Sequence, residues 1–208
     1  MNKLLHIIAS PRGEESRTLK VSKAFLDAFK KKNPSCVIDE LNAAAEALPS
    51  LTLKMVSGKY VLLGGKNLTG ELAEAWKPIE KEIERFLSAD AYLISAPMWN
   101  FSIPYTLKQY IDLIIQPKYL FRYTPKGVEG MAKGRKMLVV TSRGGDYSHG
   151  ASKSYDFQEP YLKTIFGFVG ISDITFINAE PMDALGPDVG SQKVAEACEK
   201  AKKTAASW

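Results

Sequence analysis

The sequence predicts a doubly wound α/β fold, in which helices cover both faces of a parallel sheet. Short apolar runs alternate along the chain with longer amphipathic segments, the order produced when each strand is followed by a crossover helix. The apolar runs are continuous rather than alternating, as in strands that are buried on both faces. There are only about five such runs, too few for an eight-stranded barrel.

The predicted elements follow one another in a regular order. The predicted strands are residues 4–9, 36–41, 91–96, 137–141 and 174–177. The first helix begins after Ser16, whose hydroxyl can cap it, and it ends at three lysines, residues 30–32, which suit the negative end of the helix dipole. The face of this helix that repeats at helical spacing consists of Leu19, Ser22, Leu26 and Phe29. The other predicted helices are residues 70–88, 104–115, 158–168 and 191–206.

One segment, residues 42–69, fits no simple crossover because it combines Pro49 with several glycines. We expect an irregular surface excursion here, with Leu62 and Leu63 exposed or facing a partner; a lid or a dimer arm is the alternative. The 208 residues contain no internal repeat. We therefore expect residues 1–208 to form a single domain.

Composition excludes several classes of protein. Hydrophobic residues make up 45% and charged residues 25% of the chain, so neither a disordered nor a fibrous protein is expected. No apolar run approaches the roughly 18 residues of a membrane span, and the apolar stretch at the start is too short for a signal peptide. The two cysteines, Cys36 and Cys198, form no zinc spacing, so we expect no metal site and a reducing, cytoplasmic location.

A net charge of +5 raises the question of an acidic partner. No predicted helix carries a basic stripe interleaved with aromatic residues, and no RNA-binding or zinc-finger pattern occurs. We therefore expect no nucleic-acid partner.

The loop after the first strand has the features of an anion site. It opens directly into a helix, whose first N–H groups lack intrahelical acceptors and point toward a ligand. Ser10, Ser16 and Thr18 add hydroxyl donors, and Arg12 and Arg17 add charge, which together suit a phosphate monoester. The loop lacks the glycine patterns of dinucleotide and Walker sites. An ordinary capped helix with unremarkable serines is the alternative.

Two further loops suit a flat ring. The loop after the third strand consists of Pro97, Met98, Trp99, Asn100, Phe101, Ser102, Ile103 and Pro104. Its large apolar side chains follow neither helical nor strand spacing, which favours a slot for a heteroaromatic ring over core packing. The loop after the fourth strand contains Ser142, Arg143, Gly144, Gly145, Asp146 and Tyr147. Its glycines allow main-chain N–H groups to approach a ligand closely, although a flexible turn would look the same.

The three loops are expected to lie side by side, and together they indicate one kind of ligand. In a sheet with strand order 2-1-3-4-5, the first, third and fourth strands are neighbours, and their carboxyl ends face one crevice. A phosphate site next to a slot for a flat ring describes FMN. Because hydride chemistry belongs to the flavin, no catalytic side chain is required, and no nucleophile–His–Asp set is visible.

These motifs resemble those of the FMN-dependent NADH azoreductases of bacteria, and the resemblance extends over nearly the whole chain. The matching segments are residues 10–16 (SPRGEES), 98–101 (MWNF), 120–123 (LFRY), 142–145 (SRGG) and 166–170 (FGFVG). The resemblance implies a flavodoxin-like three-layer sandwich with a five-stranded parallel sheet in the order 2-1-3-4-5. It also implies a homodimer with one FMN per subunit that reduces quinones and azo compounds with NADH or NADPH.

The resemblance also assigns residues to each part of the site. The phosphate would contact Ser10, Ser16, Arg17 and Thr18. The flavin ring would contact Pro97, Met98, Trp99, Asn100, Phe101, Ser142, Arg143, Gly144 and Gly145. The substrate side would be lined by Tyr123 and Phe168 from the partner subunit and by Tyr147, which stands where the family varies.

The expected reaction is a ping-pong, two-electron reduction in which NAD(P)H and the acceptor occupy the same slot in turn. A flavodoxin-type electron carrier is one alternative, although such carriers are usually acidic and this chain is basic. A phosphodiesterase acting on acyl carrier protein is another, but the predicted loops offer only Glu14, Glu15 and Asp146 as carboxylates.

Overall fold

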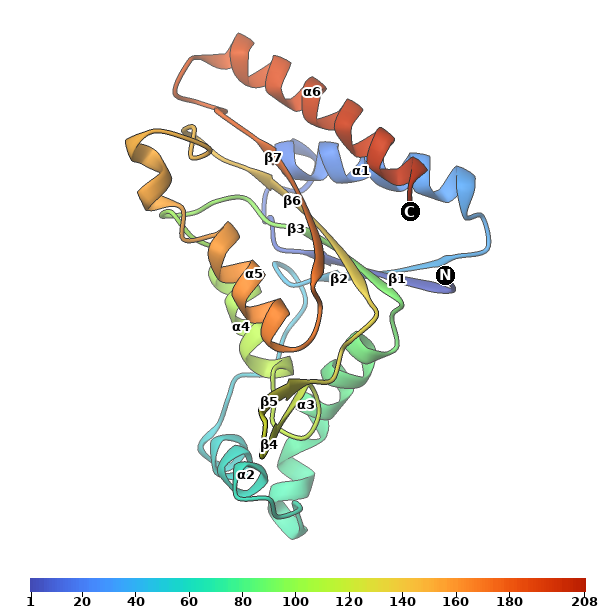
Figure 1. Cartoon of the computed structure of the whole chain (residues 1–208), viewed down its shortest axis with the longest axis vertical. Helices are drawn as coiled ribbons and strands as arrows, with labels where there is room; N and C mark the ends of the chain where they lie inside the picture. The colour runs from blue at the N-terminus through green and yellow to red at the C-terminus, as the bar shows by residue number, and fades with distance from the viewer.

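A five-stranded parallel sheet forms the centre of the protein (Figure 1). The computed structural model describes all residues from 1 to 208. The strands lie in the order β2-β1-β3-β6-β7, and every neighbouring pair is parallel. They are β1 (Lys3–Ile8), β2 (Val37–Asn42), β3 (Ala91–Ser95), β6 (Lys136–Ser142) and β7 (Asp173–Ala179). The predicted five-stranded parallel α/β sheet is therefore confirmed.

The structure also contains a second, two-stranded sheet that was not predicted from the sequence. β4 (Phe121–Thr124) and β5 (Gly127–Gly130) pair in antiparallel fashion. Because both precede the last two central strands, the central order is 2-1-3-6-7 and not the expected 2-1-3-4-5. This hairpin approaches the end of α5 closely, since a Cβ on Gly130 would lie 2.2 Å from the main chain of Val169.

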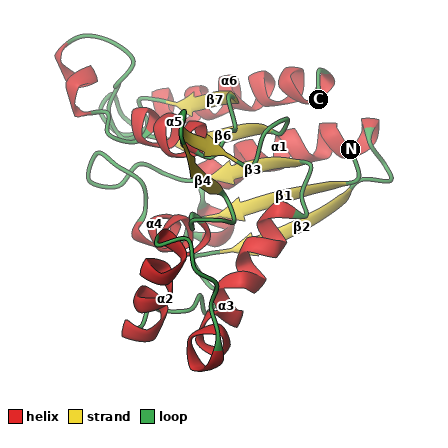
Figure 2. Ribbon diagram, turned by 60° about the horizontal axis from the view of Figure 1, so that its bottom comes forward, coloured by secondary structure: helices red, strands yellow, loops and turns green.

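Helices cover both faces of the central sheet (Figure 2). α1 (Arg17–Lys32) and α6 (Pro187–Ala206) pack on one face, and α3 (Gly70–Leu87), α4 (Tyr105–Ile114) and α5 (Glu159–Phe168) pack on the other. Successive residues of β1 enter opposite cores: Leu4 packs with α1 and α6, whereas Leu5 packs with the helices of the other face. None of the helices combines the length and the apolar character needed to cross a lipid bilayer.

Three local expectations need correction. β2 is an edge strand in which only Leu41 is buried, so it is not covered on both faces as its apolar run suggests. α6 begins at Pro187 rather than at residue 191, because proline is well accommodated in a first helical turn. The side chains of α1 that are buried are Thr18, Val21, Ser22, Phe25 and Phe29. The buried stripe of α1 is therefore rotated slightly from the predicted one, and Leu19 and Leu26 lie at its border.

The start of α1 confirms one expectation in detail, since the Oγ of Ser16 accepts a hydrogen bond from the N–H of Leu19 at 3.2 Å. The same helix ends with the three predicted lysines in its last turn.

The segment 42–69 is less irregular than expected, because it contains α2 (Leu53–Leu63). Figure 1 shows α2 beside α3, away from the sheet. The indole N–H of Trp76 on α3 donates to the carbonyl of Met55 at 2.9 Å, and Leu62 is buried rather than exposed. α2 can approach α3 so closely because Gly58 faces Trp76: a Cβ at Gly58 would lie 2.0 Å from the indole nitrogen.

This contact predicts the effect of one methyl group. Gly58→Ala should lower the free energy of unfolding by about 1–3 kcal/mol, because the added carbon overpacks a buried contact with Trp76. Gly64→Ala, at the C-cap of the same helix, is the control, since its Cβ meets nothing closer than 3.5 Å. Urea denaturation of both variants measures the difference, and equal stability would contradict the close packing of α2 on α3.

Candidate functional site

A cavity of about 420 Å³ lies at the carboxyl ends of β1, β3, β6 and β7. Its volume falls in the range of small-ligand pockets, roughly 300–1000 Å³. Its lining consists of Ser10, Arg12, Ser16, Arg17, Pro97, Met98, Trp99, Asn100, Phe101, Ser142, Arg143, Gly144, Tyr147, Met182 and Asp183. All of the residues predicted to bind the cofactor, except Thr18 and Gly145, therefore line one cavity.

One end of the cavity is formed by the start of α1. The hydroxyl of Ser10 donates to the hydroxyl of the capping residue Ser16 at 2.7 Å, and both residues are buried. The N–H groups of the first turn have no intrahelical acceptors, and the helix dipole places partial positive charge there. This end of the cavity therefore suits a phosphate group.

Thr18 occupies a different position from the predicted one. It is fully buried, and its hydroxyl forms a hydrogen bond of 2.7 Å with that of Ser142 at the end of β6. The side chain of Thr18 thus joins α1 to the central sheet instead of lining the cavity.

The two arginines of this loop are both paired with carboxylates. Arg12 lies 3.6 Å from Glu15. Arg17 lies 2.6 Å from Asp183, and its guanidinium also donates to the carbonyl of Met182 at 3.3 Å. Arg17 therefore bridges the first loop and the loop after β7 along the edge of the cavity.

A tight turn forms the opposite end of the cavity. Trp99 and Ser102 exchange two main-chain hydrogen bonds of 3.0 and 2.9 Å. The two residues between them, Asn100 and Phe101, both adopt left-handed conformations, with φ of 48° and 68°. A left-handed phenylalanine is strained, and such strain concentrates at ligand sites. The turn leaves the rings of Trp99 and Phe101 partly exposed beside the cavity.

The glycine loop contributes Gly144 and Tyr147 to the lining, whereas Gly145 is not part of it. A Cβ on Gly145 would be 3.4 Å from the phenol of Tyr147, so the two residues are close neighbours. The ring of Tyr147 meets the ring of Phe101 edge to face, with 6.2 Å between centroids. The two loops therefore contact each other at the open side of the cavity.

Arg143 lines the cavity, but its guanidinium points into the protein, where it is 1% exposed. Its Nε donates to Gln158 at 3.1 Å and its Nη1 donates to Asp156 at 3.0 Å. Glu159 and Glu180 each lie 3.7 Å from it. The expectation that this charge sits beside the ring needs correction, because the guanidinium is engaged with carboxylates.

The loop after β7 also belongs to the cavity, although none of its residues was predicted to line it. Met182 and Asp183 line the cavity, and Arg12, treated only as a flanking charge, lines it too. The main chain of this loop is joined to the glycine loop, since the N–H groups of Met182 and Asp183 donate to the carbonyls of Arg143 and Gly144 at 2.9 and 3.0 Å. The available signal was positional: the loop follows the strand next to β6 at the same edge of the sheet.

Tyr123 and Phe168 do not line the cavity of their own chain. Both pack on Phe121, with centroid distances of 5.8 and 4.8 Å, at the hairpin of β4 and β5. Tyr123 is 66% exposed and Phe168 is 38% exposed. These two residues form a partly exposed aromatic surface at the end of α5.

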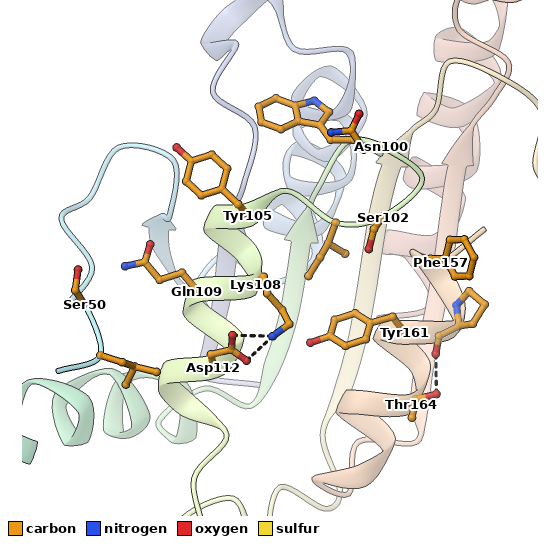
Figure 3. Close-up of a pocket in the computed structure, with 14 residues that line it drawn as sticks. Ser50, Asn100, Ser102, Tyr105, Lys108, Gln109, Asp112, Phe157, Tyr161 and Thr164 are labelled. Atoms are coloured by element: carbon orange, nitrogen blue, oxygen red, sulfur yellow. Dashed lines mark hydrogen bonds and ion pairs between the residues drawn. The ribbon is translucent and has the colours of Figure 1, made fainter. Parts of the chain in front are cut away.

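A second, larger hollow of about 1140 Å³ adjoins the first and shares Trp99 and Asn100 with it. Figure 3 shows Lys108 of α4 and Tyr161 of α5 pointing toward each other in this groove, with Tyr105 on the other side of α4. The ion pair between Lys108 and Asp112, at 2.7 Å, is its main charged feature. The groove is open and partly aromatic, and it leads directly to the ring end of the small cavity.

Together these features fit a ligand with a phosphate at one end and a flat ring at the other. Hydroxyls and helix N–H groups are the donors at one end, and tryptophan, phenylalanine and tyrosine rings surround the other. This donor set is suited to FMN, which would be held by Ser10, Ser16 and the first turn of α1 at its phosphate.

Comparison with known proteins agrees with this geometry. A family model described as having a flavodoxin-like fold matches residues 2–205. An FMN-dependent NADH:quinone oxidoreductase of Nitratidesulfovibrio vulgaris (strain Hildenborough) is 41% identical over 206 residues, 99% of each chain. One of Nostoc punctiforme is 37% identical over 209 residues, covering both chains completely.

Solved structures give the same result. An azoreductase from Bacillus anthracis str. Sterne superposes with a TM-score of 0.90 at 30% identity, covering both chains completely. An FMN-dependent NADH-azoreductase from Bacillus anthracis str. Ames Ancestor, solved in complex with FMN, has a TM-score of 0.84 at 32% identity and covers 99% of this chain and 100% of that one. The fold and cavity thus define a flavodoxin-like protein. Within that class, the chain belongs to the family of FMN-dependent NADH:quinone oxidoreductases.

The phosphate end can be tested with a substitution that preserves the helix cap. Ser16→Asp keeps a good capping side chain but places a carboxylate against the phosphate. The loss of one charge-assisted hydrogen bond, about 1.5–3 kcal/mol, should weaken FMN binding about tenfold or more. Fluorescence titration measures the dissociation constants of FMN and of riboflavin, which lacks the phosphate.

Riboflavin binding should change little in Ser16→Asp. Ser57→Asp, on the exposed face of α2, is the control and should leave the affinity for FMN unchanged. Full FMN affinity in Ser16→Asp would show that the phosphate binds elsewhere.

Proposed function

We propose that this protein is an FMN-dependent oxidoreductase that uses NADH or NADPH to reduce quinones and azo compounds. The observation that carries the proposal is the single cavity that joins the start of α1 to the aromatic turn at Asn100 and Phe101. The names of the relatives support the same cofactor and acceptors. FMN, when bound, supplies the acceptance of hydride and the storage of two electrons.

The residues of the chain would bind and orient the cofactor. Ser10, Ser16 and the helix N–H groups would hold the phosphate, and Arg17 would close the edge of the cavity through its pair with Asp183. The turn at Asn100 and its neighbours would lie along the ring. No side chain needs to act as acid, base or nucleophile, since protons can come from solvent.

We further propose that NAD(P)H and the acceptor use the same slot in turn, which gives ping-pong kinetics. The space beside the ring end is bordered by the partly exposed rings of Trp99, Phe101 and Tyr147. Flat surfaces of this kind accept flat molecules of many shapes, which favours broad acceptor specificity.

We also propose a cytoplasmic homodimer. The groove between α4 and α5 has exposed aromatic residues, including Tyr105 and Phe157, and a second copy of the chain would cover them. Tyr123 and Phe168 lie outside their own cavity, which supports their proposed role on the substrate side of the partner's cavity. The free thiols of Cys36 and Cys198 support a reducing compartment.

One experiment tests the cofactor, the activity and the order of steps. The purified protein should bind FMN, its flavin absorbance should bleach on anaerobic addition of NADH, and a quinone should restore it. Steady-state rates at several quinone concentrations should give parallel double-reciprocal lines. Failure to bind FMN would overturn the proposed function. Intersecting lines would overturn only the shared slot, and bleaching without turnover of quinones or azo compounds would indicate an electron carrier.

Mixing two variants tests which subunit of the proposed dimer supplies Tyr123 to each cavity. Tyr123→Ala should lower turnover without changing flavin content, whereas Tyr60→Ala, at a similarly exposed tyrosine on α2, should change neither. Mixed dimers of Tyr123→Ala with Ser16→Asp should regain activity, because one of their two sites then combines an intact cavity with an intact Tyr123. If activity does not recover on mixing, Tyr123 acts at the cavity of its own subunit or at neither cavity.

A further inference from the structure

The loop of residues 145–149 is held to the rest of the protein by one hydrogen bond. The N–H of Tyr147 donates to Oε2 of Glu180 at 3.0 Å. The remaining hydrogen bonds of this loop join its own members, such as Ser148 to Asp146. The ring contact between Tyr147 and Phe101 adds to this attachment. The position of Tyr147 at the cavity therefore depends on the carboxylate of Glu180.

Glu180 is itself buried, with 9% of its side chain exposed. The groups facing it are the N–H of Tyr147, the guanidinium of Arg143 at 3.7 Å, and the carboxylates of Asp146 and Asp156. Burial raises the pKa of Glu180 above its usual range, against the opposing effects of Tyr147 and Arg143, while the two neighbouring carboxylates raise it further. A carboxylate that is costly to ionise here nevertheless holds the loop.

We propose that Glu180 is a positioning residue for the flavin ring: its ionised carboxylate holds the main chain of Tyr147 and keeps the loop 145–149 against the ring end of the cavity. This inference rests on the proposed function, because the loop is taken to contact FMN. Protonation weakens the carboxyl as an acceptor and removes its attraction to Arg143. Since protonation occurs as the pH falls through a raised pKa, FMN affinity should decrease over that interval, above the range of an ordinary glutamate.

Two substitutions separate the charge from the hydrogen bond. Glu180→Gln keeps an acceptor for Tyr147 but no charge, and Glu180→Ala removes both. The control is Glu159→Gln, which removes another carboxylate at 3.7 Å from Arg143 without touching the loop. Fluorescence titration should be carried out with FMN and with riboflavin between about pH 5 and pH 8, an interval that covers a raised glutamate pKa.

At pH 8, Glu180→Ala should weaken FMN and riboflavin binding equally, by about tenfold, as expected for the loss of one hydrogen bond to a charged acceptor. The flavin affinity of Glu180→Gln should lie between those of Glu180→Ala and the wild type, and it should not vary with pH. The flavin affinity of the wild type should decrease toward that of Glu180→Gln as the pH is lowered. Glu159→Gln should retain the wild-type pH dependence of FMN binding, because Glu180 and its hydrogen bond to Tyr147 are intact.

Folding stability provides a separate readout. Because the pKa of Glu180 is raised in the folded state, the ionised carboxylate costs stability above that pKa, and this cost disappears on protonation. Glu180→Gln should therefore be at least as stable as wild type at pH 8 while binding flavin more weakly. A wild type that fails to bind FMN overturns the proposed function. A wild type that binds FMN, with Glu180→Gln equally tight and equally pH-dependent, overturns the role of Glu180.

Discussion

The buried guanidinium of Arg143 is the interaction on which the rest of the site depends. A buried charge is tolerated only when it is paired and hydrogen-bonded, and three acidic side chains and one amide surround this one. Gln158, which accepts from Arg143, donates in turn to the carbonyls of Ala96 and Pro97, where the aromatic loop begins. Glu180, on the other side, holds the glycine loop. One cation thus fixes the relative positions of loops that follow three different strands.

This arrangement explains why the site is less cationic than its sequence suggests. Arg12 is paired with Glu15 and Arg17 with Asp183, so neither adds a free positive charge to the cavity. Recognition of an anion is left to the helix N–H groups and to the hydroxyl of Ser16, which accepts from Ser10 and keeps its own proton free; these are neutral dipoles in fixed positions. The net charge of +5 therefore reflects lysines elsewhere on the surface more than it reflects the ligand.

Most of the sheet and the cavity could be predicted because their signals are local. Continuous apolar runs mark the buried strands, and Ser16 marks the start of α1 within a few residues of sequence. The features that were missed depend on contacts between distant residues. The placement of α2 rests on Gly58 facing Trp76, and the inward turn of Arg143 rests on acidic partners 13 to 37 residues away. The hairpin of β4 and β5 lacks such a signal, because each strand has four residues, most of them exposed or half-buried, and neither forms a continuous apolar run.

The two ends of the cavity differ in how firmly they are built, and this difference has a consequence for specificity. At the α1 end, Ser10, Ser16 and Thr18 are buried and bonded to one another or to β6, so the geometry offered to a ligand there is fixed. At the other end, Phe101 is strained and partly exposed, and the loop of Tyr147 has a single hydrogen bond to the protein. A ligand held firmly at one end and bordered by adjustable rings at the other keeps its position while its neighbours vary. Such a site would retain one cofactor and leave room beside it for flat acceptors of different shapes, as in the broad specificity proposed above.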